Sequence, residues 1–210
     1  MLGLLFAGAG LSTVPASAQT LSDVDGNTYA TVRIGGQLWM AENLRTSRYA
    51  DGTPIWNIKD QQDWDGVEWG DGVDWGAWSS YGNNAARGEA YGYLYNWHAV
   101  GNPRGLCPAG WRVPSDADWD ELTAFLGGEH VAGGKMKTTG TWYSPNNGAS
   151  NSSGFSALPA GSRMSGAGFS DLGRRAYFWS STAPIESGGF FSRREARYRW
   201  ITNQYSTLYA

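Results

Sequence analysis

The chain has 210 residues, of which 17% are charged, and its formal net charge at pH 7 is −3. This length supports one domain with a hydrophobic core and gives no reason to assume two. The small negative charge excludes a global electrostatic field for nucleic acid or an anionic membrane. The 30 Gly, 12 Trp, 11 Tyr and 7 Phe residues favour tight turns and large buried rings, so we expect short strands, ordered loops and no long helix.

The N-terminal segment Met1 to Ala18 has the order of a secretory signal peptide. An apolar run from Leu2 to Val14 is followed by the small residues Ala16-Ser17-Ala18, although no Lys or Arg precedes the run. About 13 apolar residues fall short of the roughly 20 that span a bilayer, so we expect no membrane insertion. No cysteine in this region accepts a lipid. The sequence therefore predicts a signal peptide at 1–18 and a single secreted or cell-surface domain at 19–210.

The next predicted element is a β-hairpin. Residues Thr28–Ile34 alternate as in a strand, and a Gly-Gly turn and a second apolar segment follow. Just before it, Asp23, Asp25 and Asn27 are spaced like the first half of a calcium-binding loop. No glutamate follows at the twelfth position of such a loop. We therefore favour a simple turn at these residues.

Residues 65–76 repeat a six-residue unit, Asp-Gly-Val-Glu-Trp-Gly and then Asp-Gly-Val-Asp-Trp-Gly. Two copies are too few for a solenoid, and we favour a low-complexity surface insertion. The alternative is an aromatic and acidic loop whose tryptophans stack on sugar rings, or whose carboxylates hold a calcium ion.

Six acidic residues at 60–74 and four arginines at 193–199 form two patches of opposite charge. The patches face either each other or two different ligands.

The clearest helix start lies at Ser115. This residue is a good N-cap after Pro114, and Asp118 completes an approximate capping box. Gly127-Gly128 ends the helix after about three turns. The apolar residues that recur on one face of this helix are Trp119, Leu122 and Leu126.

Two segments near the C-terminus predict a strand pair. Tyr177–Thr182 is rich in aromatic residues, and Arg197–Tyr209 alternates in part, with Tyr198, Trp200 and Thr202 on one face. The arginines at 193–199 are suited to an anionic polymer, with Tyr198 and Trp200 stacking beside it. A solvated strand edge is the favoured alternative.

No pattern in the chain predicts catalysis or a metal site. The single cysteine, Cys107, lies in Cys-Pro-Ala-Gly-Trp, and nothing in the sequence places His98 or His130 beside it as a base. These three residues lack the spacing of zinc ligands, and Gly133-Gly134-Lys135 lacks the rest of a phosphate-binding loop. We expect no enzyme activity, no cofactor and no metal, with Cys107 as a structural residue.

Five segments, in order along the chain, carry a resemblance to a known family: Val32–Leu44, Tyr91–Trp97, Cys107–Ser115, Gly154–Arg163 and Phe178–Thr182. Together they resemble the Fibrobacter succinogenes major paralogous domain, a family of secreted bacterial proteins. The resemblance implies an α+β, C-type-lectin-like domain with short antiparallel strands, one or two helices and long ordered loops. Relatives with that fold include the variable proteins of diversity-generating retroelements and the formylglycine-generating enzymes. No catalytic activity is established for the family, so the resemblance implies a binding or surface role.

The resemblance also implies an ending that this chain lacks. Family members usually continue past the segment that resembles Tyr205–Tyr209 into a Gly-Phe-Ser-Val-Arg-Cys strand, whereas this sequence stops at Ala210. We therefore expect the domain to be truncated at its C-terminus, with an unpaired strand edge. The partner that the resemblance implies for Cys107 is then absent. Loss of such a disulfide lowers stability by about 2 to 5 kcal/mol.

We expect a non-enzymatic module that binds an extracellular carbohydrate or protein, and not nucleic acid. By analogy with relatives that place variable residues near the C-terminus, the expected contacts are the exposed aromatic and arginine side chains of that segment, with their neighbours: Arg197, Tyr198, Arg199, Trp200, Asn203 and Tyr205. The second candidate is the tryptophan loop with Trp64, Trp69, Trp75 and Trp78.

Two alternatives remain. One is a surface-assembly protein that associates through aromatic patches. The other is an enzyme related to formylglycine generation, although one cysteine cannot supply the reactive cysteine pair of such an oxidase. In each case we assign the following tryptophans to the core: Trp39, Trp97, Trp111, Trp119 and Trp179.

Overall fold

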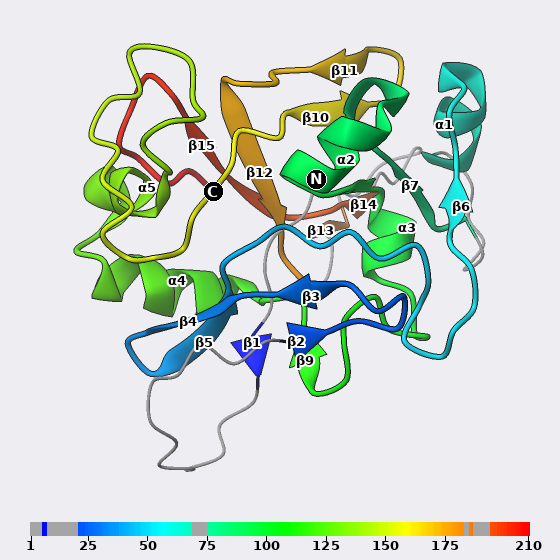
Figure 1. The fold of residues 1–210 in the computed structure, drawn as a ribbon, viewed down its shortest axis with the longest axis horizontal. Coiled ribbons are helices and arrows are strands. Elements are labelled where there is room, and N and C mark those ends of the chain that lie inside the picture. The colour runs from blue at the N-terminus through cyan, green and yellow to red at the C-terminus, as the bar shows by residue number, and fades with distance from the viewer. Residues whose placement is uncertain (1–5, 8–20, 69–74, 183–184, 187–193) are drawn as a thin grey trace.

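The computed structural model describes residues 6–7, 21–68, 75–182, 185–186 and 194–210. Within them the chain forms small sheets of two or three strands and five α-helices, the longest with ten residues. This is the expected α+β class without a long helix. Figure 1 shows β2 to β5 and α4 on one side of the molecule, and β10 to β12 with β15 on the opposite side.

The first sheets are antiparallel pairs. Strands β4 (Thr31–Ile34) and β5 (Gln37–Met40) pair across a turn in which Gly35 adopts a φ of 60°. This confirms the predicted hairpin, but the expected strand Thr28–Ile34 is divided at Ala30, and its first two residues pair with Leu21–Ser22 instead. The other pairs are β2 (Leu21–Ser22) with β3 (Thr28–Tyr29), and β1 (Phe6–Ala7) with β9 (Trp111–Arg112).

A three-stranded sheet follows, with the order β6-β7-β8. Strands β6 (Trp56–Asn57) and β7 (Ala77–Ser79) are parallel, whereas β7 and β8 (Leu94–Tyr95) are antiparallel. The expectation of antiparallel strands alone is therefore wrong at β6, because helix α1 lies in the connection between β6 and β7 and reverses the chain direction. The helices around this sheet are α1 (Gln61–Glu68), the 3-10 helix η1 (Tyr81–Asn83), α2 (Ala85–Tyr91) and α3 (Trp97–Val100).

Helix α4 (Asp116–Phe125) begins and ends where the sequence predicts. The Ser115 side chain accepts a hydrogen bond from the Asp118 amide, and the Asp118 carboxylate accepts one from the Ser115 amide. After the C-cap residue Leu126, Gly127 and Gly128 have φ values of 97° and 99°, which L-residues with a Cβ rarely adopt.

Helix α5 (Glu129–Met136) corrects the expectation of one or two helices. Its glycines suggest turns, but they serve close packing. A Cβ on Gly133 would lie 2.6 Å from the carbonyl oxygen of Thr207, and a Cβ on Gly134 would lie 2.5 Å from that of Gly148. None of the helices in the described part of the chain is both long and apolar enough to cross a membrane.

The C-terminal part contains three hairpin-like pairs. The pair of β12 (Arg175–Trp179) with β15 (Tyr198–Thr202) confirms the predicted last strand pair, and a bridge between Trp200 and Tyr209 extends it. The other pairs are β10 (Ser162–Met164) with β11 (Gly168–Ser170), and β13 (Ile185–Glu186) with β14 (Arg194–Glu195).

Four aromatic rings form the centre of the core. The ring centroids of Trp39 and Trp119 are 4.9 Å apart, and Phe155 and Phe178 contact each other edge to face at 5.6 Å. Trp119 also contacts both phenylalanines. Tilted and edge-on contacts of this kind are the favoured geometry of aromatic pairs. Trp39 and Trp119 are fully buried, which confirms their assignment to the core. The other three assigned tryptophans are partly buried and pack against the core cluster: Trp97, Trp111 and Trp179.

Candidate functional site

The C-terminal strand pair has one buried and one aromatic face. Ala176 and Phe178 of β12 point into the core, and so does Ile201 of β15. Because side chains alternate across a strand, their neighbours lie on the opposite side. We call this opposite surface the outer face and define it by its residues: Arg175, Tyr177, Trp179, Tyr198, Trp200 and Tyr209.

The rings of the outer face form a continuous contact network across three chain segments. Trp200 lies between Tyr177 on β12, at 6.4 Å between ring centroids, and Tyr209, at 4.1 Å with the planes 15° apart. Tyr198 meets Tyr177 and Trp179 edge to face at 6.0 and 6.2 Å. Tyr198 is 38% exposed, and Trp200 and Tyr209 are partly exposed. The network therefore offers ring edges and partial ring faces to the solvent.

The cationic side chain of Arg175 lies at one end of the outer face. The Arg175 guanidinium carbon lies 5.4 Å from the centre of the Trp200 ring. The Tyr177 hydroxyl donates to the Asp171 carboxylate at 2.9 Å, and Arg175 donates to the same carboxylate at 3.3 Å. Burial and the hydrogen bond to Asp171 raise the pKa of Tyr177, which keeps its hydroxyl in the donor form. These contacts hold Arg175 beside the rings.

Two of the expected contact residues of the C-terminal segment are not exposed. Arg199 is 8% exposed and donates to Asp116 and Asp120 of α4, both at 3.1 Å. Asn203 is 6% exposed and donates to the carbonyl oxygens of Tyr143 and Ser144. Their expected exposure was wrong because both polar groups bind structural partners across the fold.

Arg197 and Tyr205 are accessible. Arg197 donates to Asp116 at 2.7 Å and keeps a side-chain exposure of 40%, while Tyr205 is 56% exposed in the loop after β15. Burial opposes the ionisation of Asp116, but hydrogen bonds from Ser180 and Arg197 and the charge of Arg199 outweigh it and hold the pKa of Asp116 below its ordinary range. The basic segment therefore anchors the C-terminal hairpin to the start of α4.

The acidic segment has partners of its own. Asp65 of α1 accepts hydrogen bonds from the Gly166 amide at 3.0 Å and from Gln61 at 2.7 Å. The first of these is the largest cause that lowers the pKa of Asp65. Among the described residues, Arg197 and Arg199 form their ion pairs with Asp116 and Asp120 and none with the segment 60–68. The two patches of opposite charge thus bind different elements where the structure describes them.

The tryptophan loop is only partly a surface feature. Trp64 is 1% exposed and forms a small second core with Ile58, Val67 and Ala77. Its expected exposure was wrong because α1 turns this ring inward. Trp75 and Trp78 are partly buried, and Trp78 stacks on Tyr93 at 4.0 Å. Trp69 lies outside the described residues.

Arg163 explains why Trp64 is buried, and sequence reasoning did not single it out. Its guanidinium donates to the carbonyl oxygens of three successive residues, Ile58, Lys59 and Asp60, and to the side chain of Gln61. The guanidinium carbon also lies 4.4 Å from the centre of the Trp64 ring. Arg163 thereby attaches the start of α1 to β10. The signal that could have identified Arg163 from the sequence is its position at the end of Gly154–Arg163, one of the five segments that resemble the family.

Lys137 is a second residue that the sequence did not reveal. Its side chain is fully buried, and the ammonium donates to the carbonyl oxygens of Asn147, Thr202 and Tyr205 at 2.8, 2.9 and 3.0 Å. Burial lowers the pKa of Lys137 to about 8, so the charged form still predominates at neutral pH. Lys137 ties the loop after α5 to the loop that follows β15.

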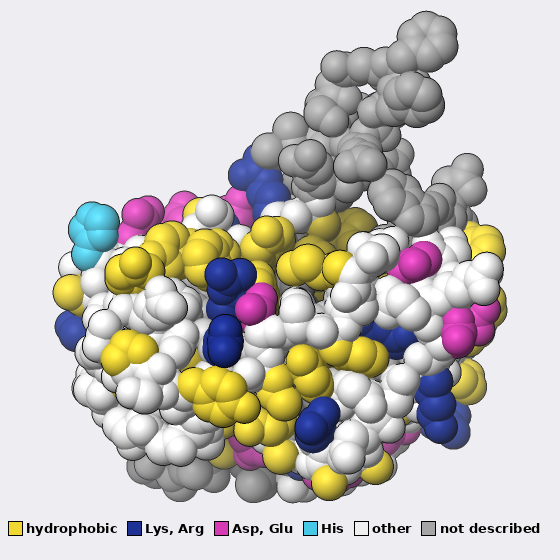
Figure 2. Space-filling model, turned by 90° about the horizontal axis from the view of Figure 1, so that it is seen from above, with side chains coloured by type: hydrophobic (Ala, Val, Ile, Leu, Met, Phe, Trp, Pro, Cys, Tyr) yellow, Lys and Arg dark blue, Asp and Glu magenta, His cyan; other side chains and the backbone are white. Residues whose placement is uncertain are grey.

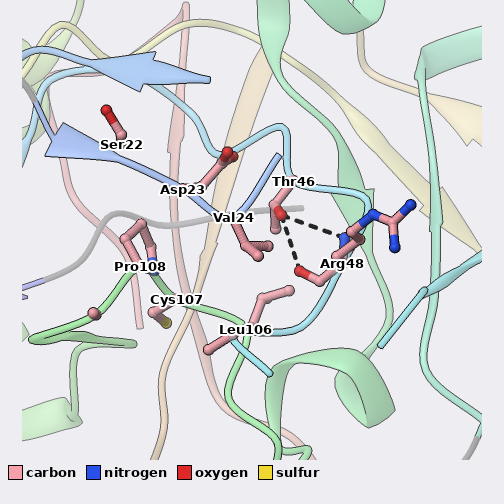
Figure 3. A pocket seen from close by; sticks show the side chains of 10 residues that line it. Ser22, Asp23, Val24, Thr46, Arg48, Leu106, Cys107 and Pro108 are labelled. Atoms are coloured by element: carbon pink, nitrogen blue, oxygen red, sulfur yellow. Dashed lines mark hydrogen bonds between the residues drawn. The ribbon is translucent and has the colours of Figure 1, made fainter. Parts of the chain in front are cut away.

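Cys107 lines a cleft of about 240 Å³ together with Leu106, Pro108, Thr46 and Arg48. Thr46 donates to the Arg48 carbonyl and accepts from the Arg48 amide, and the Arg48 guanidinium is directed away from Cys107 (Figure 3). Burial raises the pKa of the Cys107 thiol to about 12, so it stays protonated and unreactive. Neither His98 in α3 nor His130 in α5 lines this cleft.

The predicted turn at Asp23 is confirmed by its hydrogen bonds. The Asp23 carboxylate accepts from the amides of Asp25 and Asn27, from the Asn27 side chain and from the Tyr29 hydroxyl. The Asp25 carboxylate accepts from Ser47 and pairs with Arg48. In the part of the chain that the structure describes, no three His, Cys, Asp or Glu side chains gather as a metal site.

The family model described as the Fibrobacter succinogenes major domain matches residues 32–207. This range includes β4 from its second residue on, β5, α4, and both strands of the outer face. No curated protein and no solved structure matches the chain.

Proposed function

Because the chain belongs to the Fibrobacter succinogenes major domain family, we propose that it is a secreted or cell-surface, non-enzymatic module that binds an extracellular carbohydrate or protein through its outer face. The apolar segment and the Ala16-Ser17-Ala18 site in the sequence support export. We also propose a C-type-lectin-like fold. Its support is the combination of short strand pairs with the long segment between Lys137 and Gly161, which contains no helix and whose β-pairing is limited to the single bridge between Lys137 and Ala157.

The single observation that carries the binding proposal is the aromatic network of the outer face. Tyr177 is buried at 6% exposure and Trp179 packs against the core, and on these two rings lie the three accessible rings of the network: Tyr198, Trp200 and Tyr209. Contiguous exposed apolar surface of this kind marks binding sites on soluble proteins. Figure 2, which views the molecule from above relative to Figure 1, shows hydrophobic side chains gathered in bands with Lys and Arg between them.

The residue types suit recognition. Tyr and Trp offer large, rigid contact areas at a low cost in side-chain entropy, and each also has a polar tip. The apolar C–H faces of sugar rings pack on such side chains, while Tyr198 and Arg175 supply a hydroxyl and a cation for sugar or peptide oxygens. Trp, Tyr and Arg are also the residues that dominate binding energy at protein interfaces. The face thus fits either ligand class of the proposal.

The chemistry around Cys107 supports a non-enzymatic role. A thiol with a pKa near 12 is a poor nucleophile at neutral pH, since the thiolate is the reactive species. In its cleft, the Thr46 hydroxyl is bound to the backbone of Arg48, and the Asp23 carboxylate is bound within its own turn. A structural role for Cys107 fits these surroundings best.

Affinity electrophoresis in a panel of polysaccharides, together with a glycan array, tests the proposal. Trp200→Ala and Tyr198→Ala should weaken retention by roughly 30-fold, the effect of losing a contact of about 2 kcal/mol. Trp56→Ala is the matched control, because this ring is 52% exposed and belongs to β6, away from the outer face. Circular dichroism should be unchanged in all three variants.

The same variants separate the alternatives. If no glycan is retained but Trp200→Ala abolishes self-association in sedimentation, the surface-assembly function replaces the proposal. If a ligand is found and both outer-face variants retain it as well as the wild type, the outer face is not the binding surface.

A further inference from the structure

A second concave site lies away from the outer face. It has a volume of about 300 Å³ and opens between the β4–β5 turn, the C-terminal end of α4 and α5. This volume is at the lower end of ligand pockets and holds a molecule of roughly ten non-hydrogen atoms. The residues that line it are Arg33, Ile34, Gly35, Phe125, Leu126, Lys135, Ser152 and Ser153.

One wall and the floor of this cavity are apolar. Phe125 is 64% exposed although it is an aromatic residue, and its ring lies against Gly35, where a Cβ would approach Cδ2 to 2.9 Å. Gly35 has a φ of 60°, so the turn and the ring contact both require glycine there. Ile34 and Leu126 are buried beneath, at 3% and 4% exposure. The cavity therefore has an accessible aromatic wall on a rigid turn.

The polar side of the cavity is cationic. Lys135 donates to the Leu126 carbonyl at 2.8 Å, which uses one of the three ammonium hydrogens and leaves two. No described residue pairs with the exposed guanidinium of Arg33. Ser152 accepts from Ser150 and keeps its own hydroxyl hydrogen. None of the described lining residues is acidic. The Glu121 carboxylate lies near Gly36 of the same turn but does not line the cavity.

We propose that this cavity binds a small carboxylate with an apolar body. The planar fork of Arg33 matches the two carboxylate oxygens, and Lys135 adds a second positive charge. The apolar body packs on Phe125 above the buried floor. A neutral ligand would supply no negative charge to Arg33 and Lys135, and a fully polar anion would leave the aromatic wall uncovered. This site is independent of the outer face and of the binding function proposed for it.

Titration of the full-length protein with phenylacetate, followed by two-dimensional amide NMR, tests the site. Saturable shifts should be confined to residues that line the cavity. Phenylacetamide has the same shape without the charge and should bind at least tenfold more weakly. Glucuronate is a carboxylate on a polar sugar ring, so it tests whether the ligand needs an apolar body as well as the charge. It should bind more weakly than phenylacetate because its polar ring gains little from Phe125.

The variants Arg33→Gln and Phe125→Ala should each weaken the binding of phenylacetate about tenfold, because each removes one of the two proposed contacts. Both side chains are exposed, so their loss should leave the core intact. Arg174→Gln is the matched control, since Arg174 is also exposed but lies next to β12. Absence of saturable shifts at the cavity up to roughly 20 mM phenylacetate overturns the proposal. Equal binding of phenylacetamide, or an equal loss in Arg174→Gln, overturns it as well.

Discussion

Replacement of the buried Lys137 by methionine is expected to destabilise the fold strongly. Methionine keeps most of the length and the apolar stem, but it removes the donor for three carbonyl oxygens, those of Asn147, Thr202 and Tyr205. Each hydrogen bond from a charged donor contributes about 2 kcal/mol. Loss of all three would therefore cost about 6 kcal/mol if nothing offset it.

The offset is the relief of charge burial. Burial lowers the pKa of Lys137 from 10.5 to about 8, which corresponds to about 3 kcal/mol against the charged form in the folded state. Methionine carries no charge and avoids this cost. The net expected loss in the free energy of unfolding at pH 7 is therefore about 3 kcal/mol for Lys137→Met.

The assay is urea denaturation followed by tryptophan fluorescence, with Lys135→Met as the matched control. Lys135 belongs to the same helix and donates to a single carbonyl, that of Leu126, so its loss should cost about 1 to 2 kcal/mol. A Lys137→Met variant that is as stable as the wild type, or no less stable than Lys135→Met, would refute the reasoning.

The lowered pKa of Lys137 also predicts a pH dependence. Below pH 8 the folded and unfolded states both hold the proton, and between about pH 8 and 10.5 only the unfolded state holds it. Stability from this group therefore rises with pH across that window. The difference in the free energy of unfolding between the wild type and Lys137→Met should grow above pH 8, and a side-chain NMR titration of Lys137 should have its midpoint near 8.

Four further predictions concern the capping box, a glycine and the cysteine. Ser115→Ala should lower the free energy of unfolding by about 1 kcal/mol, because it removes the N-cap hydrogen bond. Hydrogen bonds outweigh burial and lower the pKa of Asp118. The destabilisation by Asp118→Asn should therefore be present above about pH 4 and shrink in acid, which urea titrations at two pH values will test. Gly161→Ala should destabilise far more than Gly166→Ala in thermal melts: both have φ near 70°, but only at Gly161 would a Cβ meet backbone oxygen at 2.3 Å. Cys107 should resist iodoacetamide at pH 8 in the folded protein and react once it is unfolded; equal rates would show that the thiol is not buried.

Local signals predicted the local structure well. The Ser115 cap with Asp118, the Gly-Gly turn after Ile34, and the alternation from Tyr198 to Thr202 all appear in the fold. Each depends on residues within a few positions of one another, so the sequence window contains the whole cause. The same holds for the aromatic side of β15, which forms one half of the candidate site.

The chain's own pattern determined the class of the fold, the start and end of α4 and the strands of the C-terminal hairpin, because capping and alternation are short-range effects. Only the tertiary structure decided which polar and aromatic residues face solvent. Arg199 is buried against α4, Trp64 lies under Arg163, and Lys137 binds the carbonyl oxygens of Asn147, Thr202 and Tyr205. Their burial depends on partners that lie ten to about a hundred residues away, as in the bond between Arg163 and the Ile58 carbonyl. A hydrogen-bond donor is buried only where the fold brings its acceptors to it.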